Sequence, residues 1–198
     1  MLILSGNKKW KKFNEVMVDY PSYLVYPAGI CSIKPEDIIG LCNWPPEETA
    51  ADEKMGRLIS SVRAKGWYDE HPGDLHLYKI PTGKYTVCSG GDHRSILSNE
   101  LSIPRINANV DVVIPENLFD QKELLFHNAI ENQIRDLENE ANEIKMSDPY
   151  FEFDSTNIAY DHVFKKIESL HRQQTEILRR ECVRLNLHVS YPFRLNLR

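Results

Sequence analysis

The stretch Val87-Cys88-Ser89-Gly90-Gly91-Asp92-His93-Arg94 marks the point where a strand pattern gives way to a helix pattern. A Gly-Gly pair allows successive backbone N–H groups to face one point. The helix predicted over 95–101 adds its own unpaired N–H groups and positive dipole. Arg94 on its first turn can fork onto two phosphate oxygens. The stretch predicts an anion site, most simply for phosphate; the alternative is an ordinary tight turn with a solvated Arg94.

The bulk composition is that of a globular protein with one well-buried domain and an accessory piece. The chain has 198 residues, of which 41% are hydrophobic and 27% charged, and its net charge is −5. This charge argues against a protein that coats nucleic acid. No apolar run reaches the length of a membrane span, so we expect no membrane contact and a cytoplasmic location. Four widely spaced cysteines argue against a zinc site or a disulfide framework, and we expect them to be small buried hydrophobes.

Periodicity places the elements around the glycine stretch. Prolines and acidic residues precede a helix that Thr49 or a neighbour would cap and that Gly66 would end. Residues 74–80 alternate and residues 85–88 are β-branched and aromatic, so the two segments should pair as a hairpin, and the alternating residues 106–114 should form another strand. Before them, the basic cluster Lys8–Lys12 could touch a nucleic-acid backbone or be a solvated arm.

The charge of the chain changes sign between its two C-terminal segments. Residues 116–154, expected to be largely helical, carry 11 acidic and 3 basic residues, whereas residues 156–198 carry 4 acidic and 8 basic residues. A long final helix capped by Ser155 or Thr156 is expected in the second segment, with an apolar stripe suited to packing or to a partner helix.

Three groups of residues carry candidate chemistry. Asp92 could bind a metal or accept a proton, or could cap the helix it opens, and His93 could act as acid, base or phosphate donor, or pack against the sheet. Glu131 and Asn132 could share a Mg²⁺ ion or orient water, although Arg135 is placed for an ordinary ion pair with Glu131. Residues 66–72 could form a pocket wall for a base or sugar, or a surface loop. No Ser-His-Asp or Cys-His arrangement is readable.

The order of these parts resembles the ParB/sulfiredoxin superfamily over about residues 30–140. The similarity lies in Thr82–Val87 and in Ser89–Leu97, which contains a turn that binds nucleotide phosphates in that family. Residues Ile130–Leu137 are similar to the E-N-x-x-R segment of ParB-type partition proteins. The resemblance implies that Glu131 orients or activates water and that Asn132 helps to hold Mg²⁺ on a nucleoside triphosphate.

The chain departs from that family at two points. Asp92 stands where sulfiredoxins have a reactive cysteine, so sulfiredoxin chemistry is not expected. The segment from about 155 is too short for both the helix-turn-helix and the dimerisation domain of partition proteins.

These observations predict an α+β fold, with a small ParB/sulfiredoxin-like mixed sheet, surrounding helices and a helical C-terminal extension. The expected parts are an N-terminal arm (1–29), the ParB/sulfiredoxin-like domain (30–146) and the extension with its basic tail (147–198). The expected function is binding of a nucleoside triphosphate with Mg²⁺, and its hydrolysis or phosphoryl transfer, in a process related to DNA. The alternatives are a ParB-like nuclease acting on DNA phosphodiesters and a non-catalytic module that binds DNA or protein.

Each candidate residue has an expected role. The catalytic candidates are Glu131, Asp92 and His93, and the metal candidates are Asn132 and Glu131. The phosphate and nucleotide contacts are expected from Ser89, Gly90, Gly91, His93, Arg94 and Arg135. The expected partners are a nucleotide, DNA through the basic terminal segments, and a second copy of the chain through the C-terminal helix.

Overall fold

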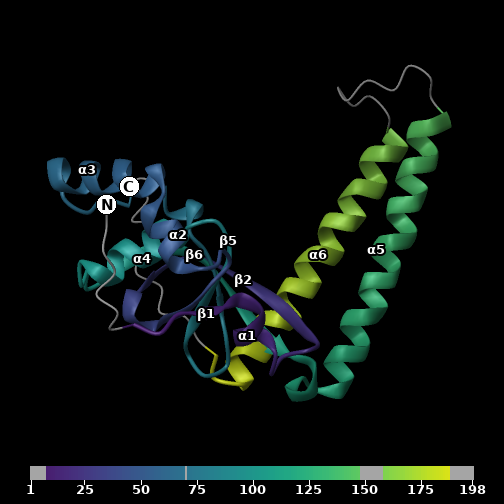
Figure 1. The fold of residues 1–198 in the computed structure, drawn as a ribbon. Helices are drawn as coiled ribbons and strands as arrows, with labels where there is room; N and C mark the ends of the chain where they lie inside the picture. Colours follow the sequence, from purple (N-terminus) through teal and green to yellow (C-terminus); the bar gives the residue numbers. More distant parts are fainter. Residues whose placement is uncertain (1–7, 70, 148–157, 188–198) are drawn as a thin grey trace, which may run out of the picture. The chain divides into compact units, whose positions relative to one another are not determined.

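The computed structural model describes residues 8–69, 71–147 and 158–187 (Figure 1). The chain divides into two compact units. The sheet unit comprises residues 1–115 with 186–198, and the helical unit comprises residues 116–185. The predicted α+β class with a mixed sheet is confirmed.

The sheet unit is built on a six-stranded mixed sheet in the order β1-β3-β5-β4-β6-β2. Its strands are β1 (Lys11–Lys12), β2 (Tyr23–Ile33), β3 (Ile38–Leu41), β4 (His76–Lys79), β5 (Tyr85–Ser89) and β6 (Ile106–Pro115). Strand β3 is parallel to β1 and β5, and β4 is parallel to β6, whereas β4–β5 and β2–β6 are antiparallel. The predicted hairpin of β4 and β5 is confirmed.

Alternating apolar residues bury β6 in the core. Ile106, Ala108, Val110 and Val112 are at most 1% exposed, as the period of two predicts. Val113 and Ile114 are also fully buried, so the end of the strand is covered on both faces.

In the described part of the sheet unit, four helices accompany the sheet, together with the short 3-10 turns η1 (Pro35–Asp37) and η2 (Pro72–Asp74). The helices are α1 (Phe13–Met17), α2 (Pro46–Ala51), α3 (Glu53–Lys65) and α4 (Asp92–Glu100). Gly66, at φ +78°, ends α3 by donating its N–H to the Val62 carbonyl, as predicted. Of the expected caps, Thr49 is buried inside α2, and its neighbour Asp52 caps α3 by accepting from the Lys54 N–H.

The N-terminal boundary differs from the expected arm over 1–29. Helix α1 buries Val16 and Met17 against Ile80 and Val113, and the first half of β2 pairs with the end of β6. The described part of this segment therefore belongs to the sheet unit, because its apolar residues are buried in the core.

The helical unit is a pair of long helices, α5 (Gln121–Ser147) and α6 (Ile158–Arg184), preceded by the 3-10 turn η3 (Glu116–Leu118). Figure 1 shows α5 and α6 side by side. Each helix buries an apolar stripe that includes Ile130 and Ile134 on α5 and Val163, Ile167, Ile177 and Leu178 on α6. The structure thus divides at Pro115, well before the expected boundary at 146, because the two helices pack on each other.

Some expectations for this unit lie outside the described residues. Not every apolar residue of the two C-terminal segments is buried, because Leu118, Leu125 and Phe164 are 45%, 69% and 48% exposed. The expected caps Ser155 and Thr156 and the basic tail after residue 187 lie outside the residues described.

Candidate phosphate-binding turn and its surroundings

The glycine turn joins β5 to α4, as the sequence predicts. Gly90 and Gly91 have φ values of +65° and +93°, and Gly91 is the N-cap residue of α4, with no side-chain hydrogen bond capping the helix. A Cβ atom built on Gly91 would lie 2.4 Å from Cδ1 of Leu75. Glycine is therefore required here for both backbone conformation and packing, while the first N–H groups of α4 lack a side-chain cap.

Asp92 connects this turn to the loop that follows β3. Its carboxylate is 1% exposed and accepts hydrogen bonds from the backbone N–H groups of Cys42 (3.1 Å) and Asn43 (2.8 Å). The Cys42 thiol (3.2 Å) and the Asn43 amide (2.6 Å) donate to it as well. The expectation that Asp92 caps its own helix is wrong. Its predicted metal-binding or catalytic role gains no support, because its oxygens already accept these bonds.

His93 faces the first turn of α3. Its Nε2 lies 3.2 Å from Oδ2 of Asp52, without the alignment of a hydrogen bond. The pKa of Asp52 is lowered, first by the hydrogen bond from the Lys54 N–H and further by His93. His93 thus lies against Asp52 where α3 and α4 meet, and its acid, base and phosphate-binding roles stay predictions.

Arg94 is held by residues that follow α3. Its Nη1 donates to the His71 carbonyl (3.1 Å), and its Nη2 forms an ion pair with Asp69. The guanidinium carbon lies 5.8 Å from the ring centre of Trp67, a cation–π contact. The alternative of a solvated Arg94 is wrong: its side chain is 15% exposed, because these groups enclose it.

A cavity of about 240 Å³ lies beside Arg94. Its lining comprises Leu58, Ser61, Val62, Lys65, Gly66, Trp67, Tyr68 and Arg94. The lining combines two cations with two aromatic rings, one of which, Tyr68, is 75% exposed. Gly66, Trp67 and Tyr68 therefore line a cavity, and its use as a wall for a base or sugar stays a prediction.

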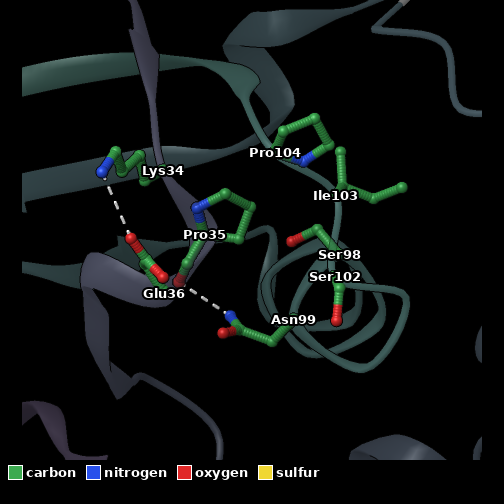
Figure 2. Close-up of a pocket in the computed structure, with 8 residues that line it drawn as sticks. All are labelled: Lys34, Pro35, Glu36, Ser98, Asn99, Ser102, Ile103 and Pro104. Atoms are coloured by element: carbon green, nitrogen blue, oxygen red, sulfur yellow. Dashed lines mark hydrogen bonds and ion pairs between the residues drawn. The ribbon is translucent and has the colours of Figure 1, made fainter.

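A second cavity, of about 340 Å³, lies at the opposite end of α4 (Figure 2). Its lining comprises Lys34, Pro35, Glu36, Ser98, Asn99, Ser102, Ile103 and Pro104, with Asn99 donating to the Pro35 carbonyl at 2.8 Å. The C-terminal end of a helix carries partial negative charge, so this cavity suits a phosphate poorly.

The basic N-terminal cluster is partly engaged near the second cavity. Lys8 Nζ donates to the carbonyls of Pro35 and Glu36 and to Asn99 Oδ1 (2.7 Å). Burial lowers the pKa of Lys8 to about 8. Lys11 and Lys12 are exposed. Lys8 therefore belongs to the packing of the sheet unit, and nucleic-acid contact by the cluster stays a prediction.

Glu131, Asn132 and Arg135 lie on α5, in the helical unit and not in the unit that holds the glycine turn. Gln174 of α6 donates to Glu131 Oε2 at 2.7 Å, and Arg135 donates to Asn132 Oδ1. Asn132 thus presents its oxygen to a cationic side chain, which is a poor arrangement for a Mg²⁺ ligand. Within the described ranges, no group of three or more His, Cys, Asp or Glu residues is arranged to hold a metal ion.

The four cysteines are free, but they differ in burial. Cys31 and Cys182 are buried as expected, Cys88 is half-buried, and Cys42 is exposed. The expectation of burial is wrong for Cys42, because it lies in the loop held by Asp92 and not in the preceding strand.

The structure also joins residues that sequence reasoning did not connect. His76 Nε2 lies 2.8 Å from Asp111 Oδ2, and His76 Nδ1 lies 3.2 Å from Ser89 Oγ. A Ser-His-Asp arrangement is therefore present, although none was readable in the sequence. Only the strand order brings these residues together, and no spacing in the sequence signals it.

Comparison with protein-family models, with curated proteins and with solved structures finds no match for this chain. Among the described helices, none is long and apolar enough to cross a membrane. The case for a function therefore depends on the geometry of the turn and its neighbouring cavity.

Proposed function

We propose that the sheet unit is a ParB/sulfiredoxin-like nucleotide-binding module. Phosphate groups of a nucleoside triphosphate would bind at the Gly90–Gly91 turn and Arg94, and the base or sugar would occupy the cavity beside Trp67 and Tyr68. The observation that carries the proposal is the position of Arg94, which belongs both to the first turn of α4 and to the wall of the 240 Å³ cavity.

Charge and shape in the cavity support this assignment. Lys65 and Arg94 supply two cations, and the first turn of α4 adds N–H groups that no side chain caps. Aromatic rings such as those of Trp67 and Tyr68 offer faces on which a base can stack. The His71 carbonyl and the Asp69 carboxylate fix the position of the guanidinium on the wall of the cavity.

Hydrolysis is a further part of the proposal, and it depends on the resemblance to ParB proteins. That resemblance assigns water activation to Glu131 and a Mg²⁺ contact to Asn132. Their oxygens accept bonds from Gln174 and Arg135 in this structure, so we derive no catalytic step through a metal ion.

Thermal unfolding with CTP, ATP, GTP, UTP or short duplex DNA, each with and without Mg²⁺, tests the proposal. A ligand that binds the folded chain stabilises it by about 2.7 kcal/mol at a hundredfold excess over its dissociation constant. We expect at least one nucleotide to raise the unfolding temperature. Stabilisation by DNA alone, or by nothing in the panel, would contradict the proposal.

Matched variants locate the site. We expect Arg94→Ala and Lys65→Ala to reduce the nucleotide-induced shift, and Arg57→Ala to leave it unchanged, because Arg57 is exposed on α3 and does not line this cavity. Lys65 is exposed, so its variant remains informative if loss of Arg94 destabilises the fold. A full shift in both cavity variants would overturn the assignment.

A further inference from the structure

Ser89, His76 and Asp111 form a hydrogen-bonded chain across three neighbouring strands. Strand β4 lies between β5 and β6, and the register places His76 opposite Ser89 on one side and opposite Asn109 on the other. Asp111 is two residues further along β6 and therefore on the same face as Asn109. This arrangement sets Ser89 Oγ 3.2 Å from His76 Nδ1, and Asp111 Oδ2 2.8 Å from His76 Nε2.

The direction of the hydrogen bonds follows from their chemistry. An ionised carboxylate only accepts, so Asp111 requires the proton of the imidazole to be on Nε2. In a neutral ring, Nδ1 then carries the lone pair and can accept the Ser89 hydroxyl proton. The hydrogen bonds among Asp111, His76 and Ser89 are thus arranged for His76 to remove a proton from Ser89 Oγ.

Asp111 and Ser89, the two ends of this series of hydrogen bonds, differ in their surroundings. The side chains of Asp111 and His76 are 16% and 27% exposed, whereas Ser89 is exposed. The Cys88 thiol donates to the His76 carbonyl at 3.4 Å, and the Tyr78 ring meets the His76 ring edge-on at 6.2 Å. The carboxylate end is therefore sheltered and the histidine supported, while the hydroxyl is open to a substrate.

We propose that Ser89 is a nucleophile toward phosphorus centres, with His76 as its general base and Asp111 as a positioning residue. In the reaction, Ser89 Oγ forms a bond to phosphorus while its proton moves to His76 Nδ1. The bond from phosphorus to the leaving group breaks, and the leaving group departs with the electron pair. A serine activated by a histidine that a third group orients is the general form of such a nucleophile.

The γ-phosphoryl group of a nucleoside triphosphate is the donor that fits the position of Ser89. Ser89 directly precedes Gly90 and Gly91, so the donor would already be bound beside it. The bond between the γ-phosphorus and its bridging oxygen would break, leaving phosphoserine and a nucleoside diphosphate. The choice of donor rests on the proposed function, whereas the activation of Ser89 does not.

A fluorophosphonate probe tests the activation directly, with fluoride as leaving group. We expect the full-length chain to acquire one adduct, which peptide mass spectrometry locates at Ser89, and Ser89→Ala to acquire none there. Ser60 is a matched control, because it is exposed on α3 and bonds only to a helix carbonyl in the described contacts. Failure of Ser89 to react, or reaction at Ser89 no faster than at Ser60, would overturn the proposal.

Variants separate activation from a structural role. We expect His76→Ala to slow labelling about a hundredfold, the lower range of general-base catalysis, and added imidazole to restore part of the rate. We expect Asp111→Asn to slow labelling and Asp111→Glu to retain more of the rate, while Asn109→Ser on the same strand has little effect. If the His76 and Asp111 variants are both labelled as fast as the wild type, the proposed activation of Ser89 is wrong.

Incubation with the nucleotide panel then tests the donor. We expect the mass of one phosphoryl group on Ser89 with the nucleotide that stabilises the chain. If a nucleotide stabilises the chain but Ser89 gains no phosphoryl group, the nucleotide is not the phosphoryl donor, and the proposed nucleotide binding still stands. If the fluorophosphonate labels Ser89 but no nucleotide stabilises the chain, Ser89 is an activated nucleophile. The proposed nucleotide binding and the nucleotide as phosphoryl donor are then both wrong.

Discussion

Arg94 and Asp69 form an ion pair that connects the first turn of α4 to the segment after α3. Both side chains are largely sheltered, at 15% and 11% exposed, and Asp69 Oδ2 also accepts from the Asn107 backbone N–H at 2.7 Å. The arginine predicted to bind phosphate therefore shares its charge with a carboxylate. An anion that binds at Arg94 would therefore lie near a negative charge as well as a positive one.

Replacement of Asp69 by Asn should increase the affinity of the cavity for inorganic phosphate. The change removes one negative charge beside Arg94, and a screened interaction of about 1 kcal/mol corresponds to about fivefold in affinity. Isothermal titration with phosphate measures the effect. Asp161→Asn, which makes the same charge change at an exposed site in the helical unit, should not alter affinity. Unchanged or weaker binding in Asp69→Asn would contradict a phosphate site at Arg94.

Gly91→Ala should destabilise the sheet unit by about 2–4 kcal/mol. Alanine would have to adopt a left-handed backbone conformation at φ +93°, and its Cβ would lie 2.4 Å from Leu75 Cδ1. Backbone strain and overpacking therefore both destabilise the variant. Gly83→Ala is the matched control, because its φ is +82° and nothing lies within 4 Å of the added atom. Urea unfolding of both variants should show a clearly larger loss for Gly91. Equal losses would mean that contact with Leu75 has no energetic weight.

The Cys42 thiol should react slowly with alkylating reagents despite its exposure. Burial of the sulfur and the neighbouring Asp92 raise the pKa of Cys42 to about 11. At pH 8 this reduces the thiolate fraction about a hundredfold relative to an unperturbed thiol. Asp92→Asn should accelerate iodoacetamide labelling of Cys42, measured by peptide mass spectrometry. Cys88, whose pKa burial also raises to about 11, serves as the internal reference that should not change. No acceleration at Cys42 would show that Asp92 does not control this thiol.

Acid should weaken the helical unit through Glu181. Burial tends to raise the pKa of Glu181, but hydrogen bonds from Arg184 and from the Asp120 N–H lower it overall. The unfolded state then binds more protons, so the stabilisation is complete above the ordinary glutamate pKa and is lost as pH falls through the lowered value. Glu181→Gln should lower the free energy of unfolding by about 1–3 kcal/mol at pH 7 and reduce its pH dependence. Urea unfolding measured by circular dichroism at several pH values checks both effects.

Glu176 provides the comparison for Glu181. It pairs with Arg179 on the exposed face of α6, where ion pairs contribute little. Glu176→Gln should therefore leave the acid transition of the helical unit nearly unchanged. A similar loss in both variants would indicate a general charge effect rather than the buried contacts of Glu181.

Local patterns predicted the main elements of the sheet unit well. The β4–β5 hairpin, β6 and the helix that Gly66 ends depend on alternation, helical periodicity and a glycine C-cap, which are properties of neighbouring residues. The cap of α3 could be narrowed only to Thr49 or a neighbour, because Thr49 and Asp52 are both good capping residues. Only the packing of α2, which buries Thr49, selects Asp52.

The partners of the candidate site residues could not be read from their neighbours. Asp92 binds a loop about 50 positions earlier in the chain, and Arg94 binds Asp69, 25 positions earlier. A carboxylate at a helix start is compatible with capping, metal binding or a tertiary hydrogen bond, and its sequence context does not discriminate among them. Glu131 of α5 illustrates the same limit, because its partner Gln174 lies on α6, 43 positions later in the chain.

The sequence by itself determined the α+β composition, the glycine turn between a strand and a helix, and the position of Arg94 on that helix. Each follows from short-range backbone preferences and hydrophobic periodicity. Tertiary structure alone decided that Asp69 pairs with Arg94 and that Ser89, His76 and Asp111 meet across the sheet. Periodicity specifies which residues face the same side of a strand but not which strands are neighbours. That order is set by hydrogen bonds and burial between segments distant in the chain.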